Sequence, residues 1–240
     1  MLKKTASVFL LVLCSFSVLC ADKSYVIDTP RAGILSSGSY STEFSCFSYG
    51  NIISSVDFGI FDVADFGLSW ELDEFVGSEA VKIALPSVHL KIRLYGGDMT
   101  YPQLTMGYNG QGAFVDEKCK SSYKQKCRGL YFVAGRELLI EGLMLNLGIN
   151  INDFSNLKIY GFLNITVPLY KDILSFMVEY DNFSSFADAR LNCGLRFLLT
   201  ECLCVDFILK DLQGEGGNDG KNEERVPNER LLKISYLSKF

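Results

Sequence analysis

The chain has 240 residues, of which 48% are hydrophobic and 21% charged, and its formal net charge at pH 7 is −5. This composition is too apolar for a disordered chain and fits a single domain, because all-β barrels of this length often form one unit. The acidic charge is dispersed and no basic cluster is present. Nucleic acid is therefore excluded as a partner, since its phosphates would repel the protein.

The N-terminus carries the pattern of an export signal. Lys3 and Lys4 precede an apolar run that ends at Leu19, and small residues follow it. A positive start, an apolar centre and small residues at the cut are typical of a signal peptide. We predict a signal peptide over residues 1–20, with cleavage near Cys20. A retained anchor and a lipoprotein acylated on Cys20 are the alternatives, and the bulky Leu19 disfavours the second.

The residues after the signal predict an irregular lead-in and then a series of strands. Residues 21–38 contain Pro30 and several glycines and serines, and we expect them on the periplasmic side. From Ser39 onward, apolar and polar residues alternate in short runs, which is the pattern of strands with one apolar face. Twelve strands are predicted, with cores at 39–47, 51–60, 63–72, 86–95, 102–110, 129–137, 141–151, 156–166, 172–181, 187–197, 202–211 and 230–240.

The predicted connections differ in length on the two sides of the sheet. The three longest gaps all fall on one side, at 73–85, 111–128 and 212–229. The gaps on the other side are uniformly short, at 61–62, 96–101, 138–140, 167–171 and 198–201. Outer-membrane barrels have short periplasmic turns, long outer loops and strands of ~9–11 residues. We therefore predict an all-β fold, an antiparallel up-and-down transmembrane β-barrel of about twelve strands, over residues 39–240.

Each predicted strand has an apolar face, which we expect to meet the lipid of the outer membrane, and a polar face that would line the lumen. Glycines on the polar face, such as Gly67 and Gly148, favour a crowded lumen. A soluble secreted barrel that holds an apolar ligand is the alternative. The residues predicted to line the lumen are Asp65, Glu71, His89, Lys91, Arg93, Glu179, Asp181, Asp188, Arg190, Arg196, Asp206 and Lys210.

Opposite charges in this set fall on neighbouring predicted strands, as Asp65 and Lys91 do. Charged pairs across adjacent strands stabilise a sheet, and small barrels fill their lumen with side chains. We favour a bonded structural network over a charged ring that selects ions in an open pore. Two strands, 129–137 and 156–166, are ambiguous because both of their faces are partly apolar.

Candidate chemistry is sparse. His89 is the only histidine, and Ser87 shares its face roughly 7 Å away along the strand, too far for a direct serine–histidine pair. A partner on a neighbouring strand stays open, so a barrel-embedded hydrolase is a minor alternative, and we expect no enzyme. Cys119 and Cys127 flank a polar stretch and predict a small disulfide loop. Neither has a histidine nearby or a CxxC partner, and we expect no metal and no cofactor.

The end of the chain resembles a known sorting signal. Residues 231–240 alternate and stop at the aromatic Phe240, as in the C-terminal strand that hands outer-membrane proteins to the barrel-assembly machinery. Three further segments, 28–40, 58–69 and 191–196, resemble barrels of a YjbH-type exopolysaccharide-associated family. The resemblance implies a barrel in the outer membrane of a Gram-negative bacterium and a link to surface polysaccharide.

These observations predict an outer-membrane β-barrel that serves as a narrow porin-like channel or as an envelope component. Its expected partners are the lipid bilayer and the assembly machinery, with small polar solutes or surface polysaccharide as the material handled.

Overall fold

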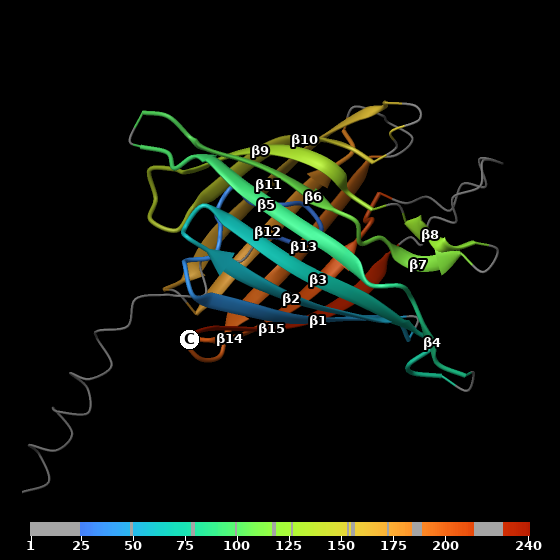
Figure 1. Cartoon of the computed structure of the whole chain (residues 1–240). Coiled ribbons are helices and arrows are strands. Elements are labelled where there is room, and N and C mark those ends of the chain that lie inside the picture. Colours follow the sequence, from blue (N-terminus) through green and yellow to red (C-terminus); the bar gives the residue numbers. More distant parts are fainter. Residues whose placement is uncertain are drawn as a thin grey trace, which may run out of the picture.

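The computed structural model has an all-β architecture (Figure 1). It describes residues 25–48, 50–77, 80–98, 100–116, 119–125, 127–152, 154, 157–171, 173–183, 189–213 and 228–240, with the backbone alone at 114–126. Within these ranges, no helix is long and apolar enough to cross a membrane.

Twelve strands form a closed antiparallel barrel, which confirms the predicted fold. Each strand pairs with the next barrel strand along the chain, and β1 pairs with β15 from Ser39 opposite Lys239 to Phe47 opposite Leu231, which closes the sheet. The barrel strands are β1 (Ser39–Phe47), β2 (Ile52–Ile60), β3 (Ala64–Asp73), β5 (Ser87–Tyr95), β6 (Gln103–Asn109), β9 (Gly129–Glu137), β10 (Met144–Ile151), β11 (Ile159–Tyr170), β12 (Leu174–Asp181), β13 (Arg190–Leu198), β14 (Leu203–Lys210) and β15 (Glu229–Lys239).

The three remaining strands lie in the long connections. The short β4 (Lys82–Ile83) pairs with the end of β3, and β7 (Ala113–Asp116) pairs with β8 (Cys119–Gln125) in a separate hairpin. Both additions lie at the same end of the barrel, on the right in Figure 1. We call this end the loop end, and we call the opposite end, where the connections are short and the chain terminates, the turn end.

A tight turn between β2 and β3 illustrates the turn end. The amide of Val63 donates to the carbonyl of Ile60 over 3.1 Å, and the two central residues, Phe61 and Asp62, have φ of 53° and 54°. Two positive φ values are those of a type I′ turn, whose twist matches that of the flanking strands. The other connections at this end are also short, whereas the three longest connections, after β3, β6 and β14, lie at the loop end, as the sequence predicted.

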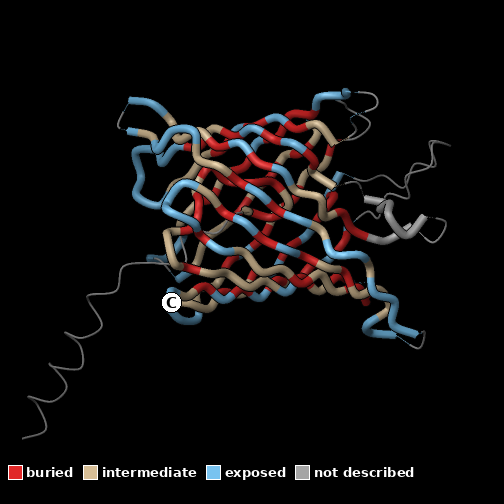
Figure 2. Tube along the Cα trace, in the orientation of Figure 1, coloured by how far each residue is buried: buried red, intermediate tan, exposed pale blue. Residues whose placement is uncertain are grey.

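The two faces of the sheet differ as the alternation predicted. In β5, Val88 and Leu90 are 43% and 41% exposed on the outside, whereas His89 and Lys91 are 9% and 3% exposed on the inside. The same alternation of buried and exposed residues follows the other strands (Figure 2). The outside of the barrel is apolar and the inside polar, which is the reverse of a soluble barrel built around an apolar ligand.

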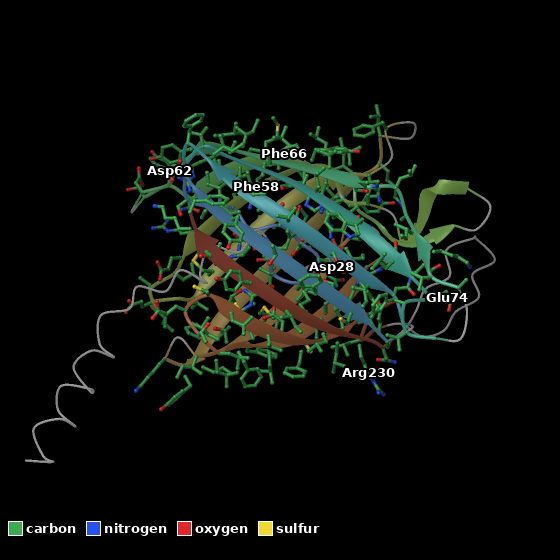
Figure 3. All side chains as sticks on the ribbon, turned by 60° about the horizontal axis from the view of Figure 1, so that its bottom comes forward. Asp28, Phe58, Asp62, Phe66, Glu74 and Arg230 are labelled. Carbon is green, nitrogen blue, oxygen red and sulfur yellow. The ribbon has the colours of Figure 1, made fainter. Side chains whose placement is uncertain are left out.

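Residues 25–36, which we call the inner segment, lie inside the barrel. Its apolar side chains are buried, with Val26 and Ala32 at 0% and Leu35 at 1% exposure. The segment turns back near Asp28, where the amide of Val26 donates to the carbonyl of Thr29. Figure 3 shows Asp28 within the outline of the barrel. The sequence pattern predicted only an irregular lead-in to the first strand here and did not place these residues in the lumen.

Candidate functional site

The inner segment is held most densely by Glu179 of β12. One carboxylate oxygen of Glu179 accepts the amides of Ile27, Asp28 and Thr29 at 3.3, 3.0 and 2.8 Å, and the hydroxyl of Thr29 at 2.6 Å. The other oxygen accepts the side-chain amide of Asn192 at 2.8 Å. Successive backbone N–H groups that converge on one anion form a nest. Here the anion belongs to the wall and the nest to the inner segment.

Other lumen side chains bind the backbone of the inner segment as a neighbouring strand would. Asn146 accepts the amide of Ala32 at 3.0 Å, and Asp65 accepts the amide of Leu35 at 2.8 Å. On the donor side, Lys91 binds the carbonyl of Gly33, Lys233 that of Ile27 and Arg196 that of Val26. These side chains supply the partners that buried backbone groups require.

Asp28 is the charged residue at the tip of the inner segment. Its carboxylate lies 2.7 Å from the ammonium of Lys210. Burial alone would raise the pKa of Asp28, but the positive charges of Lys210 and Lys233 outweigh it and lower that pKa to about 2. The carboxylate is therefore ionised at neutral pH and joins the segment to the wall.

Most of the residues predicted to line the lumen are buried within the barrel. Arg196 pairs with Asp206 over 2.9 Å across β13 and β14. Arg93 and Arg190 are partly buried, and Asp188 lies outside the described residues. The residues that the structure buries are Asp65, Glu71, His89, Lys91, Glu179, Asp181, Arg196, Asp206 and Lys210.

Sequence reasoning missed several members of this network. Arg128 forms two hydrogen bonds with Asp181, at 2.7 and 3.0 Å, and Lys233 lies 3.0 Å from Glu43. Arg128 precedes β9 and so fell in a predicted loop. Lys233 lies between Leu232 and Ile234, and that alternation was the signal that would have found it, whereas Glu43 follows the polar Thr42 in a weaker pattern.

The predicted disulfide between Cys119 and Cys127 is not formed, because Cys127 is a free thiol. β8 begins at Cys119 and runs extended to Gln125. A strand of this length covers about 20 Å, whereas the Cα atoms of a disulfide lie within about 7 Å of each other. The extended strand therefore separates the two cysteines.

Two cavities lie on either side of the inner segment and share no lining residue. The turn-end cavity, of about 1110 Å³, is bounded by Arg31 and Gly33 of the segment. The loop-end cavity, of about 180 Å³, is bounded by Tyr25, Ile27 and Asp28. The inner segment thus stands between the two openings of the lumen.

The loop-end cavity contains a chain of three polar side chains. The Nδ1 of His89 lies 3.3 Å from a carboxylate oxygen of Asp57, and its Nε2 lies 2.8 Å from the hydroxyl oxygen of Ser69. The Ser69 hydroxyl donates to the side-chain carbonyl of Gln111 at 2.7 Å. The serine beside His89 comes from the neighbouring strand β3 and not from position 87, the one weighed from the sequence.

Among the described residues, no group of three or more His, Cys, Asp and Glu side chains is placed to hold a metal ion. The sequence matches no family model and no curated protein. Among solved structures, a KdgM porin is similar in fold, with a TM-score of 0.51 at 8% sequence identity. The match covers 84% of this chain and 99% of that porin. At this identity, the likeness shows a porin-like barrel fold.

Proposed function

We propose that this chain is an outer-membrane β-barrel that forms a narrow porin-like passage, closed by its own inner segment. The observation that carries the proposal is the backbone of residues 25–36 bonded to side chains from several barrel strands, including Asp65 in β3, Lys91 in β5 and Glu179 in β12. A solute that crosses the lumen must displace this segment. The proposed cargo is small and polar, because the wall of the lumen is polar and charged.

The outside of the barrel supports a location in a bilayer. Its strands expose large apolar side chains, with Phe44 at 50%, Leu147 at 52% and Phe207 at 56% exposure. Exposed apolar surface on this scale is unfavourable in water, and the outward band of a membrane barrel is apolar. The proposed compartment is the outer membrane of a Gram-negative bacterium, reached after removal of the signal peptide.

The ends of the chain support the route of assembly. The amide of Phe240 donates to the carbonyl of Gly38 at 2.8 Å, and its ring lies 5.0 Å from that of Tyr40, beside the seam of β1 and β15. A terminal aromatic strand at this seam fits delivery by the barrel-assembly machinery. The link to surface polysaccharide rests on the resemblance of short sequence segments alone.

The location is tested by expressing the full chain in a Gram-negative host. The envelope is fractionated, and the extracted protein is run on a denaturing gel with and without boiling. We expect recovery in the outer membrane and a mobility that changes on boiling, as for a closed barrel. Recovery as a soluble periplasmic protein would refute the membrane proposal.

The closed passage is tested by conductance in planar bilayers. We expect the full chain to show little conductance and a variant without residues 25–36 to form a steady open pore. Glu179→Ala keeps the segment but removes its main anchor, so openings should become frequent. Ser55→Ala, in the same lumen, is the control and should resemble the parent. Equal conductance of all four proteins would contradict closure by the segment.

A further inference from the structure

Asp57, Ser69 and His89 of the loop-end cavity come together because Gly67, the position between them in the sheet, has no side chain. Asp57 in β2 lies opposite Gly67 in β3, and Gly67 lies opposite His89 in β5. A Cβ on Gly67 would lie 2.0 Å from a carboxylate oxygen of Asp57. The glycine therefore lets the Asp57 side chain pass over β3 and reach His89, two strands away.

Ser69 completes the arrangement from β3 itself. It lies two residues beyond Gly67 and so points to the same face of the sheet. Its hydroxyl oxygen is 2.8 Å from Nε2 of His89, while Asp57 occupies the Nδ1 side of the ring. A hydroxyl, an imidazole and a carboxylate in this order are the parts of an activated nucleophile. The Asp57 carboxylate holds the proton on Nδ1, and Nε2 acts as the base once the Ser69 hydroxyl, which donates to Gln111 in this structure, turns its proton toward Nε2.

Gln111 covers the hydroxyl of Ser69. Its side-chain carbonyl accepts a hydrogen bond from that hydroxyl at 2.7 Å, and Ser69 is 0% exposed. A carboxamide is planar and carries a carbonyl, as an ester does. Gln111 thus fills the space beside the Ser69 hydroxyl that an acyl substrate would have to enter. It belongs to the connection between β6 and β7 and not to a strand, so it can move aside without breaking the barrel.

We propose that Ser69, His89 and Asp57 form a catalytic triad that hydrolyses short acyl esters of polar alcohols. With Gln111 displaced, the Ser69 oxygen attacks the ester carbonyl carbon while its proton passes to Nε2 of His89. Collapse of the intermediate breaks the bond to the alcohol, which leaves with that proton. Water then attacks the acyl-serine, gives a proton to His89, and releases the carboxylic acid as Ser69 regains its proton.

The position of the triad limits its substrate. His89 faces the lumen, whereas Val88 and Leu90 on either side of it face outward, so acyl chains in the bilayer do not reach the site. The substrate must be soluble and enter from the loop end. Charged residues of the same cavity, among them Arg128 and Lys233, suit a polar alcohol, and the volume of about 180 Å³ limits the acyl group to a short chain.

The test uses the full chain as a folded barrel in detergent. A fluorophosphonate probe reports the activated serine by covalent labelling, and p-nitrophenyl acetate reports turnover. We expect labelling at Ser69 that Ser69→Ala abolishes and that His89→Ala slows by about 100-fold or more, since a general base contributes about that much. Added imidazole should restore part of the rate of His89→Ala, which a merely structural role would not allow.

The controls separate the triad from other lumen serines. Ser55 lines the same cavity and lies opposite Ser69 in β2, yet no histidine contacts it in the described part of the chain, so Ser55→Ala should label like the parent. Gln111→Ala uncovers Ser69 and should label faster. Gel mobility before and after boiling verifies that each barrel is closed, and Gln111→Ser replaces the alanine variant if that barrel fails to close. Absence of labelling in both the parent and the uncovered variant, or labelling that survives Ser69→Ala, would overturn the proposal.

Discussion

Two walls of the lumen carry similar polar residues but use them differently. On β10 to β13, the packed wall consists of Asn146, Asn164, Glu179 and Asn192, which bind the inner segment or one another. On β2, β3 and β5, the open wall consists of Asp57, Ser69 and His89, which bind one another beside the loop-end cavity. A polar side chain whose partner is the backbone of its own chain is committed to structure. One that binds other side chains around a cavity remains available to a ligand.

Glu179→Ala should break the packed wall and cause the largest loss of stability. It removes the acceptor of three amides and a hydroxyl, all buried or partly buried. A buried donor left without a partner costs about 1–3 kcal/mol, so we expect a loss of about 3–6 kcal/mol. Denaturant unfolding, followed by gel mobility without boiling, measures it. Glu179→Gln keeps an acceptor and should lose clearly less; equal losses would contradict the role of the carboxylate.

The link between Asp28 and Lys210 predicts how acid acts on the same wall. The pKa of Asp28 is lowered to about 2, so its ionised form stabilises the folded state above the unfolded value near 3.9. That stabilisation, of about 2.5 kcal/mol, is lost as pH falls from 4 through 2. Conductance should rise over this range in the parent. Asp28→Asn should flatten the change, and an unchanged pH profile in that variant would refute the link.

The strand pattern predicted the barrel well because alternation depends only on which residues face water or lipid. The twelve strands, the long connections and the inward residues follow from it. The inner segment did not follow, because no periodic pattern marks an irregular chain bonded by side chains. Its signal was indirect: the inward apolar residues of β9 and β11, such as Val133 and Phe162, pack against Ala32. The contacts within the open wall were also missed, because two residues on neighbouring strands can be paired only when the register of those strands is known.

Gly67→Ala tests the open wall, where the glycine lets Asp57 reach His89. The added methyl group would lie 2.0 Å from the Asp57 carboxylate and 2.6 Å from the carbonyl of Val56. We expect Asp57 to leave His89 and probe labelling at Ser69 to slow by about tenfold or more, as a base without its orienting group loses efficiency. The matched control is Gly148→Ala in β10, which is similarly crowded but neither lines the loop-end cavity nor lies on a strand that carries a triad residue. Equal slowing in both variants would point to general strain.

Phe240→Ala should have the smallest effect on the folded barrel, because it touches neither wall. The ring is 85% exposed, stacks on Phe58 and contacts Tyr40 in a tilted arrangement, so its loss should cost about 1 kcal/mol or less. The same change removes the terminal aromatic residue that we assign to assembly. The expected result is therefore a normal unfolding midpoint for the protein that reaches the membrane, together with a several-fold lower yield in the outer-membrane fraction. If stability falls and yield does not, the ring acts in the seam and the assembly role is wrong.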